Sequence, residues 1–310
     1  MKKIPVWIDT DTGVDDAVAL IVASKLDEID LAGVSAVAGN TSLENAFRNA
    51  RDVLSLVGRS DVKVYHGADR PLVIDLHTAE YVHGSNGLGG AKIPLSDAPI
   101  QTENAWDALY EAAKKYKGEL VVCPVGPLTN IAIAIAKHPD IVGMIKELNV
   151  MGGALIGGNV TPCSEFNIHT DPHGAETVMK SGIHVNLFGL DVTHKAYLDD
   201  DDIDAIASFD NPVARLFVDS NHLLYDAREK LHWKGVCEHD SCPVIYTARP
   251  DWFKGHDCGI YVETQGTITF GKTVSDLWTD FKFEDRHCTA FLDVDRKKFA
   301  SKIIDTYRSF

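Results

Sequence analysis

Short apolar runs alternate with stretches of helical periodicity through the first two thirds of the chain. The apolar runs predict buried strands at residues 4–9, 29–37, 63–66, 119–123, 147–151 and 184–188. Between the first two runs, residues 15–26 carry apolar side chains at helical spacing, and a second helical pattern begins at Ser42. This alternation is typical of the α/β class, with an open, mostly parallel sheet flanked by helices.

Three polar loops interrupt the alternation, at residues 83–90, 152–167 and 234–242. In an open α/β sheet, ligands bind beyond the carboxyl ends of the strands, where such loops gather. We therefore expect the functional site among these loops. No internal repeat or Pro/Ser-rich linker divides the sequence, so we expect one domain over residues 1–310.

Composition and charge exclude several function classes. The 310 residues include 30 Lys+Arg and 45 Asp+Glu, which gives a formal net charge of −15. Such a field repels phosphate backbones and anionic lipid surfaces, so we expect no nucleic-acid partner. The apolar stretches fall short of the roughly 20 residues that span a bilayer, and we expect no membrane association. The N-terminal apolar run is too short for a signal-peptide core, which favours a cytoplasmic protein.

The densest group of candidate functional residues is DTDTGVDD at residues 9–16, directly after the first predicted strand. It brings four carboxylates into one strand-turn-helix segment: Asp9, Asp11, Asp15 and Asp16. Helix capping would explain one or two of them, but not four. Like charges this close favour a bound cation, and an all-oxygen donor set suits Ca²⁺ or Mg²⁺. The DxD motif of haloacid-dehalogenase-type phosphatases is a competing interpretation, which Gly13 weakens because a Thr normally stands there.

Further motifs follow the octet in order along the chain. They are AGN at 38–40, PVGPLTN at 124–130, MGG at 151–153, EFN at 165–167, DP at 171–172 and HD at 239–240. Together these motifs resemble the nucleoside hydrolases of the inosine-uridine-preferring type. The resemblance implies a Rossmann-like fold, a homodimer or homotetramer, and calcium-dependent hydrolysis of the N-glycosidic bond of ribonucleosides. Thr12 stands where the family usually has Pro, a departure that removes no ligand.

The resemblance also implies roles for single residues. Ca²⁺ would be held by the carboxylates of Asp11, Asp16 and Asp240 and by the backbone carbonyl of Val125. Asp11 would also take a proton from the attacking water, and His239 would protonate the departing base. A histidine in this acid role favours pyrimidine or broad specificity over a purine specialist.

Substrate contacts are implied in the same way. The residues expected to bind the ribonucleoside are Asp15, Asn40, His83, Asn159, Glu165 and Asn167. Asp15 and Asn167 would hold the 2′- and 3′-hydroxyls of the ribose, with Asn40 nearby. Asn159 and Glu165 would hold the 5′-hydroxyl. His83 and the segment 221–233 are expected near the base, whose identity the sequence does not reveal.

Two plainer interpretations of these residues remain. A non-catalytic, calcium-dependent nucleoside or ribose binder would share the fold, but it needs neither a water-activating base nor a leaving-group acid. Asp240 could simply cap the helix that follows it. The six cysteines have irregular spacing and no CxxC, so they predict buried thiols rather than disulfides or a zinc site.

Overall fold

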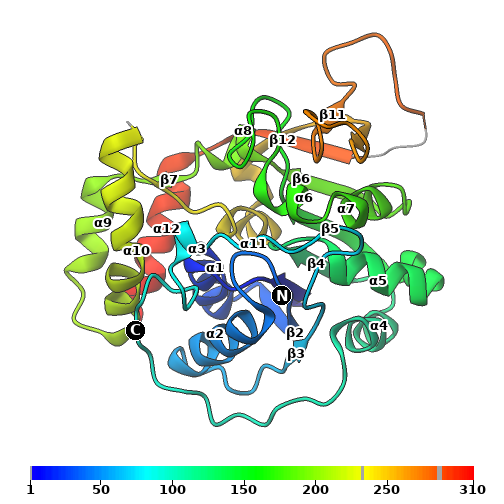
Figure 1. Ribbon diagram of the computed structural model, residues 1–310. Coiled ribbons are helices and arrows are strands. Elements are labelled where there is room, and N and C mark those ends of the chain that lie inside the picture. The colour runs from blue at the N-terminus through cyan, green and yellow to red at the C-terminus, as the bar shows by residue number, and fades with distance from the viewer. Residues whose placement is uncertain (1, 232–233, 285–287) are drawn as a thin grey trace.

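The computed structural model describes residues 2–231, 234–284 and 288–310, and its centre is an eight-stranded sheet (Figure 1). In sheet order the strands are β3 (Val64–His66), β2 (Ile29–Ala36), β1 (Ile4–Thr10), β4 (Leu120–Pro124), β5 (Ile145–Met151), β6 (Val185–Phe188), β12 (Cys288–Val294) and β9 (Phe253–Cys258). Every neighbouring pair is parallel except β12 and β9, which are antiparallel. The predicted open, mostly parallel sheet is confirmed, and the six predicted strands agree with the structure to within two residues at each end.

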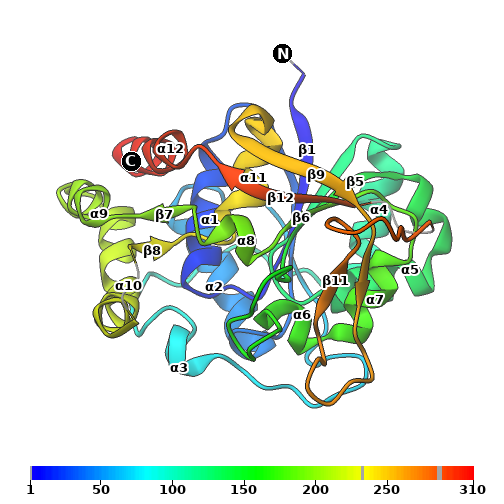
Figure 2. The same cartoon turned by 90° about the horizontal axis from the view of Figure 1, so that it is seen from above.

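Helices cover both faces of this sheet, as the view from above shows (Figure 2). They are α1 (Val14–Lys25), α2 (Leu43–Leu56), α3 (Glu80–His83), α4 (Ala105–Tyr116), α5 (Thr129–Lys137), α6 (Phe166–Thr170), α7 (Pro172–Met179), α8 (Leu190–Thr193), α9 (Asp200–Ala207), α10 (Pro212–Leu231), α11 (Ser241–Ala248) and α12 (Arg296–Arg308). Helices α1, α2, α10, α11 and α12 pack on one face, and α4, α5 and α7 pack on the other.

Strand β1 shows why its sequence is apolar almost throughout. Successive side chains of a strand point to opposite faces of the sheet, and here both faces are covered. Val6 and Ile8 belong to the core beneath α1 and α2, whereas Trp7 belongs to the core beneath α4 and α5. All three side chains are at most 1% exposed, which explains the apolar run before the strand reaches its polar end at Asp9 and Thr10.

The order of the strands shows where in this sheet a ligand site is expected. The first six strands have the order 3-2-1-4-5-6, which is that of the doubly wound Rossmann fold. This order reverses between β1 and β4, and ligands bind outside the carboxyl ends of the strands at such a switch point. The segment 9–16 begins at the carboxyl end of β1, and Val125 directly follows β4. These candidate metal ligands from two parts of the sequence therefore lie at the switch point.

The last two strands of the sheet, β12 and β9, were not predicted. Strand β9 has the sequence FKGHDC, with four exposed residues between two buried ones, and carries no apolar run. Two short two-stranded sheets, β7 (Tyr197–Leu198) with β8 (Val236–Cys237) and β10 (Ile260–Val262) with β11 (Thr273–Ser275), were also missed. The cysteine prediction is correct in that all six are thiols rather than disulfide partners, and four of them are buried. Over the described ranges, the helices are too short or too polar to cross a bilayer.

Candidate active site

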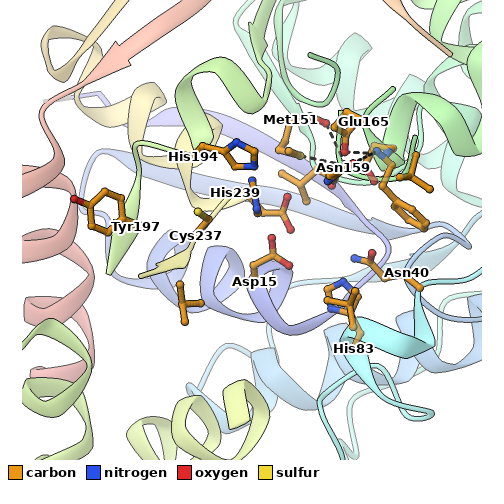
Figure 3. Close-up of a pocket in the computed structure, with 18 of the residues that line it drawn as sticks. Asp15, Asn40, His83, Met151, Asn159, Glu165, His194, Tyr197, Cys237 and His239 are labelled. Atoms are coloured by element: carbon orange, nitrogen blue, oxygen red, sulfur yellow. Dashed lines mark hydrogen bonds between the residues drawn. The ribbon is translucent and has the colours of Figure 1, made fainter. Parts of the chain in front are cut away.

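A cavity of about 590 Å³ opens at the switch point (Figure 3). Residues from all three polar loops, 83–90, 152–167 and 234–242, line it. Nine of the predicted site residues line it: Asp15, Asn40, His83, Val125, Asn159, Glu165, Asn167, His239 and Asp240. The other two, Asp11 and Asp16, are fully buried and do not line it. Glu165 and Asn159 lie at one end of the cavity, and Cys237 and Tyr197 lie at the other (Figure 3).

Three carboxylates converge beside this cavity, and two of them, Asp15 and Asp240, reach its wall. Asp15, Asp16 and Asp240 each offer one oxygen, and these oxygens all lie within 4.8 Å of one another. Burial, and then the charge of Asp16, raises the pKa of Asp15 to about 7. Burial and the neighbouring aspartates likewise hold the pKa of Asp240 well above its usual value. Such a group is costly unless protons or a cation neutralise it, so these residues could hold a metal ion.

Asp11 and Asp9 leave the same strand end, but only Asp11 joins this group. Burial, and then the charge of Asp16, raises the pKa of Asp11. Its Oδ2 accepts a hydrogen bond from the backbone N–H of Asn40 at 2.6 Å, whereas its buried Oδ1 has no partner. Asp9 Oδ1 accepts hydrogen bonds from the Ser35 hydroxyl and from Asn130 Nδ2, the latter at 2.7 Å, and its buried Oδ2 has no partner. Of the four carboxylates in residues 9–16, Asp9 is therefore held by other partners, and Asp240, which the resemblance assigned to the metal, lies with Asp15 and Asp16.

Local hydrogen bonds hold Asp16 in place while leaving Asp240 available. Asp16 Oδ1 accepts from the Thr10 hydroxyl at 2.5 Å, and Oδ2 accepts from the N–H of Gly13 at 2.9 Å and from Asn40 Nδ2 at 3.0 Å. Asp240 directly precedes α11, yet its side chain accepts no capping hydrogen bond. The interpretation of Asp240 as a simple helix cap is therefore wrong.

The loop 152–167 supplies the polar residues at one end of the cavity. Glu165 caps α6: its carboxylate accepts from the N–H groups of Asn167, Ile168 and Gly153 at 2.9, 3.2 and 2.8 Å. Burial raises the pKa of Glu165 to about 6. Asn159 Oδ1 accepts from the N–H of Phe166 at 2.9 Å, which fixes the orientation of its amide.

Asn167 connects this loop with the end of β4. Its Nδ2 donates to the carbonyl of Val125 at 2.8 Å and also contacts the carbonyl and sulfur of Met151, both at 3.3 Å. The carbonyl of Val125 therefore lies beside Asn167, and both residues line the cavity.

Two neutral histidines face the cavity. His239 Nδ1 is 2.7 Å from the Thr193 hydroxyl, and its ring meets His194 edge-on at 5.7 Å. Burial, and then the charges of His194 and His83, lowers the pKa of His239 to about 3. Burial lowers the pKa of His83 to about 4. Because His83 Nδ1 accepts from the N–H of Val14 at 3.1 Å, its Nε2 carries the proton.

Several residues at the Cys237 end were not predicted. His194, Tyr197 and Cys237 line the cavity there. Leu223, from the segment 221–233 that was expected near the base, also lines the cavity. The position of His194 beyond the predicted strand at 184–188 was the available signal, because side chains that follow a parallel strand reach the ligand edge. Of the segment 221–233, expected near the base, residues 232–233 lie outside the described residues.

Comparison with known proteins agrees with this geometry. Residues 6–301 match the family model described as inosine-uridine preferring nucleoside hydrolase. A pyrimidine-specific ribonucleoside hydrolase (RihA) of a Shewanella species is 36% identical over 304 residues, which cover 97% of this chain and 95% of that relative. RihA of Photobacterium profundum is 36% identical over 310 residues, which cover 99% of both chains.

Solved structures show the same similarity. A plant nucleoside hydrolase matches with a TM-score of 0.92 and 27% identity and covers 99% of both chains. A purine-preferring ribonucleoside hydrolase from Gardnerella vaginalis matches with a TM-score of 0.91 and 31% identity and covers 98% of both. The chain therefore belongs to the inosine-uridine preferring nucleoside hydrolase family and is an enzyme of that class, a ribonucleoside N-glycosidase.

Proposed function

We propose that this enzyme uses Ca²⁺ to hydrolyse the N-glycosidic bond of ribonucleosides and releases ribose and the free base. The observation that carries the proposal is the convergence of Asp15, Asp16 and Asp240 within 4.8 Å of one another, beside a cavity that Asp15, Asp240 and His239 line. Breaking a ribosyl C–N bond builds positive charge on the sugar and negative charge on the base. Carboxylates favour the positive charge, and an acid or N–H donor relieves the negative charge.

The donor set fits a hard cation. We assign the ion to the carboxylates of Asp11, Asp16 and Asp240 and to the carbonyl of Val125, all of which are oxygen donors. Two observations together support the assignment of Asp11: its buried Oδ1 has no partner, and the charge of Asp16 raises its pKa, so it lies beside the cluster. When bound, the ion would neutralise the crowded carboxylates and make a nearby water more acidic. Ca²⁺ is a weaker Lewis acid than Zn²⁺, so a carboxylate base is still needed.

The side chains around the cluster divide the remaining work. Asp11 removes the proton of the attacking water. Asp15 and Asn167 bind the 2′- and 3′-hydroxyls of the ribose, with Asn40 beside them. These contacts use binding energy away from the reacting bond to fix its geometry.

The different residues along the cavity favour one orientation of the bound nucleoside. Asn159 and Glu165 lie at one end, and we assign them to the 5′-hydroxyl. The base then lies toward His239, with His83 also facing it. His239 donates the proton that the departing base needs, and Thr193 holds the other ring nitrogen.

We propose pyrimidine or broad base specificity. The curated relatives described above are named pyrimidine-specific, which supports the pyrimidine preference. The similar structure from Gardnerella vaginalis is named purine-preferring, which supports the alternative of broad specificity. A panel of uridine, cytidine, inosine and adenosine separates these outcomes by their kcat/KM values.

Uridine hydrolysis tests the proposal against the non-catalytic binder. We expect purified enzyme with Ca²⁺ to release equal amounts of uracil and reducing sugar. Chromatography of the base and a reducing-sugar assay measure the two products. Tight uridine binding without either product would support the binder and reject the hydrolase; a phosphomonoester serves as the negative control for phosphatase activity.

Removal of the metal is expected to lower the melting temperature more at pH 8 than at pH 5. The pKa of Asp15 is raised from 3.8 to about 7 in the folded, metal-free protein. Between those values the folded carboxyl holds a proton that the unfolded chain has lost, so metal-free stability falls as pH rises across this window. The ion restores this stability at high pH but must displace protons at low pH. Thermal unfolding with added CaCl₂ and after exhaustive dialysis measures both shifts, and equal shifts at the two pH values would contradict the assignment.

A further inference from the structure

The first residues of the loop 152–167 are held by two adjacent side chains from a distant part of the chain. Thr273, at the start of β11, accepts a hydrogen bond from the N–H of Ala154 at 3.0 Å and donates to the carbonyl of Ala154 at 2.8 Å. Lys272 Nζ donates to the carbonyls of Ala154 at 2.7 Å and Leu155 at 2.9 Å. Four hydrogen bonds thus connect one dipeptide of the β10–β11 hairpin to one dipeptide of the loop.

The far end of the loop is attached to the same hairpin. The Ser164 hydroxyl donates to the carbonyl of Phe270 at 2.5 Å, and the Cys163 thiol lies 3.1 Å from the carbonyl of Ile268. Both acceptors lie in the connection between β10 and β11. The loop is therefore fixed to one hairpin on both sides of Asn159.

Lys272 and Thr273 hold the loop in position without contacting the cavity. Thr273 is only 1% exposed and Lys272 is partly buried, yet neither lines the cavity. Asn159 and Glu165, which do line it, are both carried by the loop. Glu165 also accepts from the N–H of Gly153, the residue before the attachment at Ala154, so a shift there reaches its carboxylate directly.

We propose that Lys272 and Thr273 are positioning residues that hold Asn159 and Glu165 where they bind the 5′-hydroxyl of the nucleoside. The inference rests on the proposed function and adds to it the hairpin as the part that determines affinity for that hydroxyl. A misplacement of roughly 1 Å by a residue outside the cavity costs up to about a hundredfold in rate.

The test compares uridine with 5′-deoxyuridine, which lacks the hydroxyl. We expect Lys272→Met and Thr273→Val to lower kcat/KM for uridine by about ten- to a hundredfold, because each removes two hydrogen bonds to the loop. The value for 5′-deoxyuridine should change less than about threefold, because that substrate never uses the contact. Thr273→Ser keeps the hydroxyl and should restore the uridine value.

Two variants from the next segment serve as matched controls. Lys282 Nζ donates to the carbonyl of Asp276 at 3.0 Å, and the Thr279 hydroxyl donates to the carbonyl of Phe281 at 2.9 Å. Lys282→Met and Thr279→Val therefore delete the same chemical groups and the same kind of contact without touching the loop. Both should keep the parental preference for uridine over 5′-deoxyuridine.

Each other outcome has a definite meaning. Equal losses on the two substrates, or no loss on uridine, would overturn the positioning role while the parent enzyme still hydrolyses uridine. A parent enzyme that treats the two substrates alike would remove the 5′-hydroxyl assignment and this inference with it, but not nucleoside hydrolysis. A parent enzyme inactive on both substrates would overturn the proposed function itself.

Discussion

Replacement of Asp11 by asparagine is expected to lower kcat/KM for uridine by about a thousandfold or more and to weaken Ca²⁺ binding. Loss of a general base alone removes about 10²–10⁴ in rate, and an amide also cannot supply the negative charge that the ion needs. The fold should tolerate the change, because the asparagine oxygen can accept the Asn40 N–H that Asp11 Oδ2 accepts now. The amide nitrogen then replaces Oδ1, which has no protein partner.

Asp9→Asn is the matched control for this experiment. Asp9 is on the same strand end and equally buried, but its partners are Ser35 and Asn130 rather than the cluster. Steady-state kinetics and calcium titration of both variants separate the two aspartates. A fully active Asp11→Asn enzyme, or a loss of the same size in Asp9→Asn, would contradict the role of Asp11.

Replacement of His239 by alanine is expected to slow uridine hydrolysis by about 10²–10⁴, the usual contribution of general acid catalysis. Burial lowers the pKa of His239 to about 3, so the ring is uncharged in the resting enzyme. Negative charge that develops on the departing base favours protonation of the ring and couples proton transfer to bond cleavage. A p-nitrophenyl riboside has a leaving group that is already a stable anion, and the variant should hydrolyse it almost as fast as the parent.

The calcium affinity of His239→Ala shows whether His239 acts as the acid or only supports Asp240. His239 precedes Asp240, so its replacement could disturb that carboxylate instead. In that case both substrates would slow together and calcium affinity would fall. The acid role predicts a selective loss on uridine with unchanged calcium affinity.

The sequence predicts the sheet best where both faces of a strand are buried. The run from Ile4 to Ile8 is apolar because helices cover both sides of β1, so its pattern is visible without a structure. Strand β9 pairs only with β12 at the sheet edge and has four exposed residues, so its sequence resembles that of a loop. Pairing between β12 and β6 joins segments about a hundred residues apart, and no local pattern encodes it.

The sequence indicated which residues lie at the candidate site, but not which of their side chains lie together. Spacing alone groups Asp9 with Asp11, and only the positions of Ser35 and Asn130 show that Asp9 is bound elsewhere. Asp240 reaches the cluster through tertiary folding, which the resemblance could anticipate and periodicity could not. Thr193 was missed because a hydroxyl that orients a histidine has no sequence signature.

Helix α8 spans just four residues, Leu190–Thr193, yet it contacts both the loop 152–167 and His239. Asp191 accepts from the N–H groups of Leu155 and Ile156 at 2.7 and 3.1 Å, and Thr193 contacts His239. A protein engineer who grafts the loop 152–167 from a relative must therefore transplant this single turn with it. Under the roles proposed for Asn159, Glu165 and His239, recognition of the sugar and of the base cannot be exchanged as separate modules in this scaffold.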